Sequence, residues 1–455
     1  MRILHYSLGF PPARRGGMTA YCMDLMDAQA EKGDEVALLW PGPLKNKNER
    51  CAIVVGRQHT LRSGKLCDSF SIDNPLPVTL VDGILDPSWQ LISKSKTPFE
   101  RFFDMHPFDV LHVHTLMGLP VELVVAAKNH GIPVVFTSHD YFPICGRLVL
   151  YRGGNVCSSG NDFKACCACN SGGLSVSKIR LIQSPAYGLI KESKLAKLLR
   201  ARHNSRFEDQ STNLTRSCDY SKSLLYKEIR DRNVCLLNDF DCIFYNSELT
   251  KRVYEHYGVS NSHSTVLHVT NINIADFRSP LSVGNNVRFG YLGGFTSHKG
   301  FGLLLEACDR LWDSGIRNFR LSIFGDGDIN RPYVECFPPF KSGDFAQAAD
   351  HFDVAVVPSK WYETFGFVTS ESLSYGKPVI VTNHVGASDL VRDGVNGRVV
   401  APEVSELADA LEELVVNRSI IEEFNAWICA NEPPICMAEH ERQIKGAYQS
   451  VIGQL

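Results

Sequence analysis

Short apolar runs alternate with longer amphipathic segments along the first half of the chain. Four of these runs predict buried β-strands: Arg2–Ser7, Glu35–Leu39, Val110–His114 and Val134–Ser138. Met18–Lys32 and Leu119–His130 predict helices, and each is followed by a glycine where a C-terminal cap belongs. Apolar strands separated by helices are typical of a parallel sheet that is covered on both faces.

The alternation restarts in the second half. The last strand-like run before this restart, Cys242–Asn246, precedes a helical segment through Tyr257. Four runs after the restart predict strands: Val287–Leu292, Arg320–Phe324, Asp353–Pro358 and Pro378–Thr382. Lys299–Asp313 and Phe367–Tyr375 predict helices between them. We therefore expect an α/β protein with two doubly wound, Rossmann-like domains that face each other across a cleft.

The restart of the pattern divides the chain. We assign residues 1–275 to an N-terminal domain and residues 276–436 to a C-terminal domain, and we expect the helical segment 437–455 to cross back to the first domain. An irregular, cysteine-rich insertion interrupts the first domain at about 145–232. Ligands of open α/β sheets bind beyond the carboxyl ends of the strands, so the cleft is the expected site.

Composition removes several classes of protein. The chain has 455 residues, 44% hydrophobic and 21% charged, and its formal net charge of -3 gives no indication of nucleic-acid binding. Its apolar stretches fall short of the roughly 18 residues that span a bilayer. The opening residues Met1–Tyr6 read as a strand rather than as a secretory leader, so we expect a cytoplasmic protein.

Two glutamates carry the sharpest chemical signal. Glu363 follows the predicted strand Asp353–Pro358, and Glu371 lies eight positions later in a helix that starts near Gly366. The first turn of such a helix has unpaired N–H groups and a positive dipole end, which attract phosphate and sugar oxygens. Carboxylates accept hydrogen bonds from sugar hydroxyls. The structural alternative is a helix cap at Glu363 and a solvated residue at Glu371.

The residues around this pair resemble a known family. Glu363 and Glu371 match the E-x7-E signature of retaining GT-B glycosyltransferases, and the stretches Gly376–Ile380 and Asp393–Gly397 fit the same pattern. The chain is therefore similar to glycosyltransferase family 4, of the bacterial group 1 type. That resemblance implies an acceptor-side first domain and a second domain that binds the nucleotide sugar.

The family's roles carry over to matching positions. Glu363 is expected to contact the donor sugar's outer hydroxyls and Glu371 the nucleotide ribose, while Phe365 and Gly366 offer backbone donors to the sugar and its phosphate. Lys299 could reach the diphosphate as a compact cation. Gly294 stands where the family usually has an arginine, which leaves one expected positive charge missing. A surface lysine at a helix N-terminus is the structural alternative for Lys299.

Two positions of the first domain complete the predicted site. Gly16 and Gly17 lie between the first strand and the first helix, where the family's glycine-rich loop approaches the donor phosphate and the acceptor. His139 follows the strand Val134–Ser138, at a position where the family has a histidine that hydrogen-bonds the donor sugar. His114 is expected to be structural or to line the acceptor side. The alternatives are a plain strand-to-helix turn at Gly16 and Gly17 and a purely structural role for His139.

The insertion contains a cluster of cysteines. Cys166 and Cys169 have the C-x2-C spacing that lets two thiolates bind one tetrahedral ion, and Cys145 and Cys157 could complete the set, which leaves Cys167 spare. Some bacterial relatives of the family carry a similar insertion. We hypothesise a structural zinc ion; free thiols or a labile disulfide are the alternatives.

These observations predict a retaining glycosyltransferase that moves a hexose from a UDP- or GDP-sugar to a saccharide or lipid-linked acceptor. The resemblance implies catalysis without a metal cofactor, and relatives that build bacterial surface polysaccharides suggest peripheral contact with the inner membrane. The alternative is a catalytically silent GT-B subunit that binds and activates a partner transferase; the missing arginine at Gly294 supports it, and the presence of both Glu363 and Glu371 counts against it. A phosphorylase with the same architecture is a further alternative. A dehydrogenase is disfavoured because no G-x-G-x-x-G follows the first strand.

Overall fold

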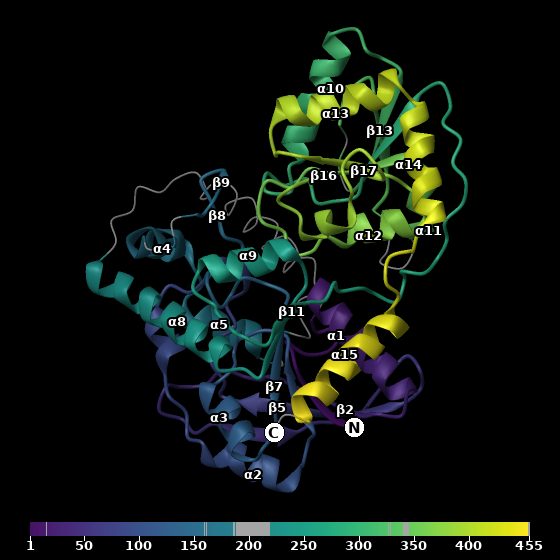
Figure 1. Ribbon diagram of the computed structural model, residues 1–455. Coiled ribbons are helices and arrows are strands. Elements are labelled where there is room, and N and C mark those ends of the chain that lie inside the picture. Colours follow the sequence, from purple (N-terminus) through teal and green to yellow (C-terminus); the bar gives the residue numbers. More distant parts are fainter. Residues whose placement is uncertain are drawn as a thin grey trace.

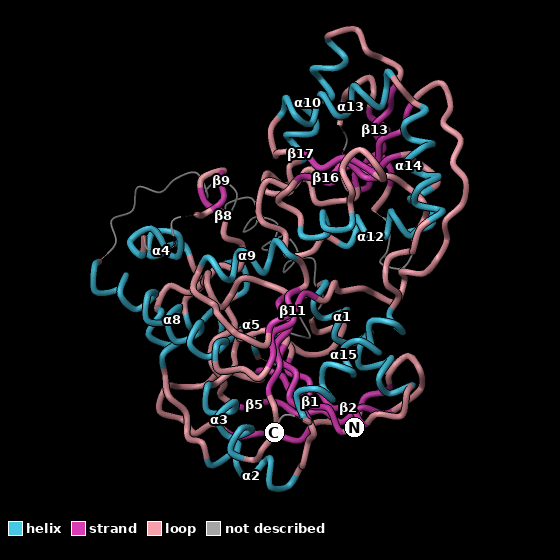
Figure 2. Tube along the Cα trace, in the orientation of Figure 1, coloured by secondary structure: helices cyan, strands magenta, loops and turns pink. Residues whose placement is uncertain are grey.

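The computed structural model describes residues 1–14, 16–158, 160, 162–184, 187, 219–325, 327, 329–339 and 345–453. The chain forms two lobes, and each lobe has a sheet with helices on its two faces (Figure 1). Figure 2 shows the strands running through the middle of each lobe. The expected α/β architecture of two Rossmann-like domains is confirmed.

The sheet of the first lobe has seven parallel strands in the spatial order β5-β2-β1-β6-β7-β10-β11, with two short antiparallel strands beside β5. Sequence order reverses between β1 and β6, which is a topological switch point. The strands are β1 Arg2–Tyr6, β2 Glu35–Pro41, β3 Ala52–Val55, β4 His59–Thr60, β5 Leu66–Asp73, β6 Val110–Val113, β7 Val134–Ser138, β10 Cys242–Tyr245 and β11 Ser264–Val266.

The sheet of the second lobe is parallel throughout, in the order β14-β13-β12-β15-β16-β17. This is the Rossmann order, and its switch point lies between β12 and β15. The strands are β12 Val287–Tyr291, β13 Phe319–Phe324, β14 Val334–Phe337, β15 Val354–Val357, β16 Val379–Thr382 and β17 Gly397–Val400.

Helices cover both faces of each sheet. In the first lobe they are α1 Gly17–Glu31, α2 Thr97–Met105, α3 Val121–Asn129 and α9 Glu248–His256, with α4 Phe163–Cys169, α5 Val176–Gln183 and α8 Tyr220–Asn238 in the insertion. In the second lobe they are α10 Phe301–Asp313, α11 Phe345–Ala349, α12 Phe367–Ser374, α13 Val404–Val416 and α14 Ser419–Ala430. None of the helices in the described ranges is at once long and apolar enough to cross a membrane.

The predicted strands and helices of both halves are confirmed, most of them within two residues of their expected ends. One boundary is wrong in a way that matters. The helix expected from Lys299 begins at Phe301, because Gly300 adopts a left-handed conformation with φ 73° as its N-cap. Lys299 therefore lies in the turn before α10 rather than in the helix. The polar part of the insertion at 188–218 lies outside the described residues.

The last helix, α15 Met437–Ile452, lies beside α1 in the first lobe although it follows the second lobe in sequence (Figure 1). Ile444 and Tyr448 of α15 belong to a buried apolar cluster that also contains Leu25 of α1 and Ile428 of α14. One hydrophobic core thus joins the two lobes through the C-terminal segment.

Candidate functional site

Two loops at the switch point of the second sheet bring a cation and a carboxylate together. One loop follows β12 and carries Lys299, and the other follows β15 and carries Glu363. The Lys299 Nζ atom lies 2.5 Å from Glu363 Oε1. The Ser359 hydroxyl donates to the second carboxylate oxygen at 2.7 Å. The sequence placed both charged residues in one site without indicating that they form an ion pair.

The backbone explains why the two loops meet. Gly300 lies so close to the loop after β15 that a Cβ atom on it would be 1.7 Å from the Pro358 carbonyl oxygen. The amide of Lys360 donates to the His298 carbonyl at 2.9 Å, which fixes the turn against the loop. Trp361 packs beside this turn, and the Lys299 ammonium lies 5.3 Å from the centre of its indole ring.

The surroundings of Glu363 keep its carboxylate ionised. Burial acts to raise the pKa of Glu363, but the Lys299 ammonium and the Ser359 hydroxyl outweigh burial and hold the pKa below its ordinary value. An ionised carboxylate only accepts hydrogen bonds. Glu363 can therefore receive hydroxyl donors from a ligand, and it cannot serve as a proton donor near neutral pH.

The helix that follows presents its N-terminus at the same place. Gly366 is the N-cap of α12, with φ 97°. A Cβ atom on Gly366 would lie 2.6 Å from Val385 Cγ1, so this turn requires glycine. The Thr369 amide donates to the Gly366 carbonyl at 3.1 Å, which leaves the amides of Phe367 and Val368 as the donors at this end of α12 that can bind an anion. Phe365 is buried beneath the turn, 3% exposed, and its carbonyl accepts from Ala387 at 2.6 Å.

The first lobe faces this helix through its glycine loop. A Cβ atom on Gly17 would be 3.5 Å from the Phe367 ring of α12. Gly16 and Gly17, together with His139, line a cavity of about 330 Å³ whose other wall includes Trp361 and Thr364. We call this space the interdomain cavity. Its lining thus brings three predicted residues of the first domain next to the loop that carries Glu363.

His139 is joined to Thr364 and to a row of buried histidines. The Thr364 hydroxyl donates to the His139 carbonyl at 3.1 Å, which links the two lobes. The His139 ring lies 3.3 Å from His114, measured from Nε2 to Nδ1, and His114 Nε2 lies 3.0 Å from His5 Nδ1. His5 Nε2 ends the row at the Gln29 side-chain oxygen, 2.8 Å away. His5 lies in β1, and His114 and His139 directly follow the neighbouring strands β6 and β7.

The donor and acceptor roles in this row fix the tautomers. Burial lowers the pKa of His5 to about 4 and that of His139 to about 3, so both rings are neutral at pH 7. His5 donates from Nε2 to Gln29, which leaves its Nδ1 to accept from His114. His114 is also held neutral by burial, and its Nδ1 accepts from Nε2 of His139. His139 therefore keeps Nδ1 as a hydrogen-bond acceptor.

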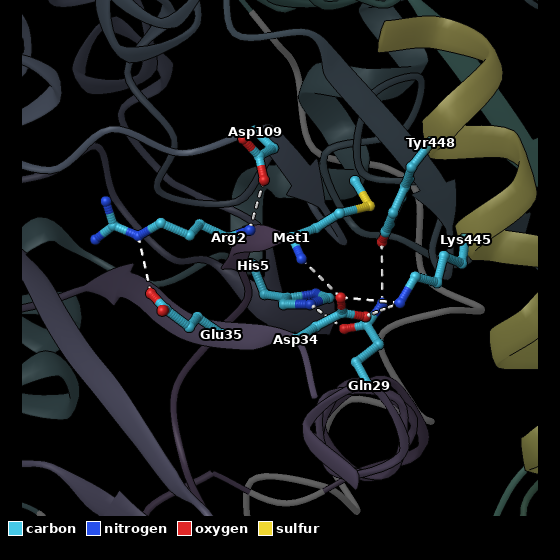
Figure 3. Close-up of polar contacts among 9 residues, drawn as sticks. All are labelled: Met1, Arg2, His5, Gln29, Asp34, Glu35, Asp109, Lys445 and Tyr448. Atoms are coloured by element: carbon cyan, nitrogen blue, oxygen red, sulfur yellow. Dashed lines mark hydrogen bonds and ion pairs between the residues drawn. The ribbon is translucent and has the colours of Figure 1, made fainter. Parts of the chain in front are cut away.

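Gln29 is itself oriented by the C-terminal helix (Figure 3). Its side-chain nitrogen donates to the Tyr448 hydroxyl at 3.5 Å. The Tyr448 hydroxyl in turn lies 2.5 Å from His112 Nδ1. Lys445, one turn earlier in α15, forms an ion pair with Asp34 at 2.8 Å. In the sequence, the only hint of this network is that His5 and His112 are polar residues within otherwise apolar strands.

Glu371 lies on the next turn of α12, away from the Lys299–Glu363 pair. Asn271, in the segment that connects the two sheets, donates to Glu371 Oε1 at 3.0 Å. Burial raises the pKa of Glu371, and the Asn271 hydrogen bond partly offsets that rise. No hydrogen bond or ion pair in the described residues joins Glu371 to Glu363, so the two carboxylates form separate contacts.

Gly294 lies in the loop after β12, on the same side as Lys299. Its carbonyl accepts from the Tyr291 hydroxyl at 2.6 Å. The atom nearest to a Cβ placed on Gly294 is Thr296 Cγ2 at 3.8 Å, which is an ordinary contact distance. The loop therefore has room for a side chain at the position where the family has an arginine.

The four cysteines of the predicted metal set, Cys145, Cys157, Cys166 and Cys169, are free thiols that line a second cavity, of about 60 Å³. Cys167 is disulfide-bonded and does not line it. Burial raises the pKa of Cys157, Cys166 and Cys169, which disfavours a thiolate nucleophile. A role in structure is therefore favoured over one in catalysis.

Two family models match the chain, one in each lobe. The model described as glycosyl transferases group 1 matches residues 286–417, and the model described as glycosyltransferase family 4 matches residues 15–158. The first of these matches contains the loops that carry Lys299 and Glu363. The second contains the glycine loop and His139.

Curated relatives agree with the family models. An uncharacterized glycosyltransferase of Methanocaldococcus jannaschii is 32% identical over 25% of this chain and 31% of its own length. The alpha-D-kanosaminyltransferase of Streptomyces kanamyceticus is 27% identical over 35% of this chain and 45% of its own. The chain thus matches less than half the length of these relatives. An uncharacterized 42.6 kDa protein in the cps region of Klebsiella pneumoniae is 24% identical over 85% of this chain and 86% of its own.

Solved structures share the fold over the whole chain. The sucrose-phosphate synthase of Thermosynechococcus elongatus has a TM-score of 0.56 at 15% identity, and the match covers 100% of this chain and 100% of that one. HepE of Anabaena, solved in complex with UDP-glucose, has a TM-score of 0.55 at 16% identity and covers 99% of this chain and 100% of its own. At these identities the likeness establishes the two-domain fold alone.

Proposed function

Because the chain belongs to the group 1 glycosyltransferases, we propose that it transfers a hexose from a UDP- or GDP-sugar to an acceptor with retention of the anomeric configuration. The observation that carries this proposal is the Lys299–Glu363 pair at the switch point of the second sheet. It lies where open α/β sheets bind ligands. The glycine loop and His139 of the first domain line the adjoining interdomain cavity.

The charges of the site suit a nucleotide sugar. The Glu363 carboxylate would accept hydrogen bonds from the donor sugar's hydroxyls, and Lys299 would reach the diphosphate while keeping its contact with Glu363. Lys299 has three N–H donors, so it can contact a phosphate oxygen and the carboxylate together. The open amides of α12 and of the Gly16–Gly17 loop would add further donors to the same anion. Glu371 would bind the ribose from its separate position on α12.

The reaction breaks the bond between the anomeric carbon and the terminal phosphate oxygen. The acceptor hydroxyl attacks that carbon from the same face, and its proton passes to the departing phosphate oxygen. The products are the glycosylated acceptor and a nucleoside diphosphate. Lys299 and the helix N-terminus stabilise the negative charge that develops on the leaving group, so we propose catalysis without a metal cofactor.

The interdomain cavity favours an amphiphilic acceptor. Beyond the glycine loop its wall is largely apolar, with Leu80, Val81, Met117 and Leu148 among the lining residues. Apolar surface would favour a lipid-linked saccharide over a free one. We propose such an acceptor in the assembly of a bacterial surface polysaccharide or glycoconjugate. The protein would then contact the inner membrane peripherally from the cytoplasm.

The first experiment measures donor binding and turnover. Purified protein is screened by thermal shift against UDP- and GDP-sugars, because a ligand that binds the folded state raises the unfolding temperature. Transfer is then followed with the stabilising donor, and the anomeric configuration of the product is determined by NMR. An inverted product would refute the retaining mechanism. With an α-linked donor, we expect the glycosylated product to be α-linked.

A matched pair of variants tests the assignment of the site. Glu363→Gln keeps the shape of the side chain but removes the charge, and we expect kcat/KM to fall by roughly 10²-fold or more, because a buried charged hydrogen bond to the sugar is lost. Glu412→Gln, on the exposed face of α13, is the control and should leave turnover unchanged. Equal activity of the two variants would exclude Glu363 from the site.

The same measurements address the rival function. A catalytically silent subunit would bind a nucleotide sugar without turning it over, with or without an acceptor. It would also restore the activity of a partner transferase. Turnover by the isolated chain that is lost in Glu363→Gln would exclude that alternative.

A further inference from the structure

The cavity lined by the four cysteines is built from three separate segments of the insertion. Cys145 follows the turn after His139, Cys157 follows the short strand β9 Asn155–Val156, and Cys166 and Cys169 lie on α4. Residues three apart on a helix share one face, so the two thiols of α4 point to the same side. The enclosed volume of about 60 Å³ exceeds the roughly 30 Å³ that one water occupies in the liquid. The cavity therefore has room for one ion.

An arginine beside the thiols supplies an independent observation. The Arg230 guanidinium donates to Cys166 Sγ at 3.5 Å and lies between the rings of Phe163 and Tyr257, at 4.8 and 5.0 Å from their centres. Arg230 also donates to the backbone carbonyls of Ile144, at 2.8 Å, and of Gly160. A zinc ion with four thiolates would carry a net charge of −2, and the neighbouring guanidinium would partly balance it.

Metal binding would bring the four sulfurs closer together. Tetrahedral zinc holds each sulfur at about 2.3 Å, which places the sulfurs about 4 Å apart. In the described residues, the one group of three metal-ligating atoms within 4.8 Å of one another is His5, Cys22 and His114. The two histidines of that group already hydrogen-bond each other and Gln29. No three of the four cysteine sulfurs lie within 4.8 Å of one another, so they would have to move together on binding.

The cysteine cavity adjoins the interdomain cavity through one loop. Cys145 and Leu150 line the cysteine cavity, whereas Leu148 and Val149 line the interdomain cavity next to His139 and Trp361. Leu148 and Leu150 have φ angles of 65° and 45°, in the left-handed region that leucine rarely adopts. Each such residue costs about 1–2 kcal/mol, so the surroundings must hold the loop in place.

We propose that Cys145, Cys157, Cys166 and Cys169 bind one structural zinc ion, and that this ion holds the loop 145–150 in the shape that forms a wall of the interdomain cavity. The ion takes no part in bond making or breaking. The metal site does not depend on the proposed sugar transfer, whereas the role of the loop as an acceptor wall rests on it.

Metal content tests the site directly. Protein purified without a metal-affinity tag and reconstituted with zinc is expected to hold about one zinc per chain by elemental analysis. The double variant Cys166→Ser/Cys169→Ser should lose it. Cys235→Ser/Cys436→Ser, which alters two exposed thiols elsewhere, should retain it. Cobalt in place of zinc should give the thiolate charge-transfer absorption of a tetrahedral sulfur site.

Measurements on the wild-type chain keep the test decisive even if the double variant fails to fold. Absence of stoichiometric metal, with all four thiols open to titration, would overturn the proposal, as would a disulfide between any two of them by mass spectrometry. Removal of zinc should speed hydrogen exchange in the peptide 141–150 and leave exchange in β16 unchanged. Equal exchange in that peptide with and without zinc would refute the link to the loop.

Discussion

At the scale of single residues, Gly294 and Lys299 decide how much positive charge the loop after β12 offers to a diphosphate. Lys299 is partly neutralised by Glu363, 2.5 Å away. Gly294 adds no charge, although the nearest atom to a Cβ placed there is 3.8 Å away. The loop therefore lacks a second positive charge but has room for one. A substitution at Gly294 can add that charge without a steric clash.

We expect Gly294→Arg to lower the KM for the nucleotide-sugar donor by about two- to fivefold, because a partly exposed guanidinium near a phosphate contributes about 0.5–1 kcal/mol. Steady-state kinetics with the preferred donor at two salt concentrations measure the effect, which should shrink at high salt. Gly284→Arg, in an open part of the connecting segment, adds the same charge as a control. If both variants change KM equally, the charge acts through the protein's overall field and not through this loop.

At the scale of elements, the start of α12 sets the position of Glu363 relative to the open helix amides. Gly366 has a φ of 97° and packs closely against Val385. The Thr364 carbonyl accepts hydrogen bonds from two hydroxyls of the first lobe at the start of α9, those of Ser247 at 2.8 Å and Thr250 at 2.9 Å. The turn is thus fixed from both sides.

Gly366→Ala is expected to lower the free energy of unfolding by about 1–3 kcal/mol, since a Cβ at this left-handed position is strained and would lie 2.6 Å from Val385. It should also lower kcat, because the turn must shift away from Glu363. Urea unfolding and steady-state kinetics measure the two effects. Gly446→Ala lies in an exposed part of α15 with no atom near its Cβ, and there stability should rise by up to about 1 kcal/mol. A stable, fully active Gly366→Ala protein would contradict this account.

At the scale of the whole molecule, α15 ties the end of the second lobe to the sheet of the first. His440 of α15 lies 2.8 Å from the Tyr21 hydroxyl of α1, and Tyr448 contacts His112 of β6. Burial lowers the pKa of His440 to about 4. The unfolded chain binds a proton at this histidine below about pH 6.5, whereas the folded chain does so only near pH 4. Stability from this group is therefore present above pH 6.5 and is lost as the pH falls toward 4.

We expect the free energy of unfolding to fall on acidification between pH 6.5 and pH 4, and His440→Gln to reduce that fall by about 2–3 kcal/mol, because glutamine can keep the bond to Tyr21 without titrating. Urea unfolding at several pH values measures the difference. Burial raises the pKa of Asp140 to about 6, so Asp140 changes the stability in the opposite direction over this pH range. Asp140 is present in both proteins, so the difference between wild type and His440→Gln reports on His440. His263→Gln, at an exposed histidine, is the control. Parallel pH profiles for wild type and His440→Gln would refute the prediction.

Much of the architecture could be read from the sequence because it is encoded locally. Strands such as Val134–Ser138 and Val354–Val357 are short apolar runs, and glycine marks the ends of the helices between them. The edge strand β3 was not predicted, because its apolar run Ala52–Val55 is only four residues long and, in the structure, mostly exposed. The Glu363 and Lys299 loops were also predicted, since each directly follows a strand whose carboxyl end must face the cleft.

The sequence by itself determined two α/β halves, the residues at the carboxyl ends of their strands and the grouping of four cysteines in one insertion. Tertiary structure alone decided which of these side chains touch. The Lys299–Glu363 bond joins residues 64 positions apart, and the row from Gln29 through His5 and His114 to His139 depends on the order of strands in a sheet and on the return of α15. Periodicity reports which face of an element is buried, whereas contacts between distant elements arise only when those faces pack together.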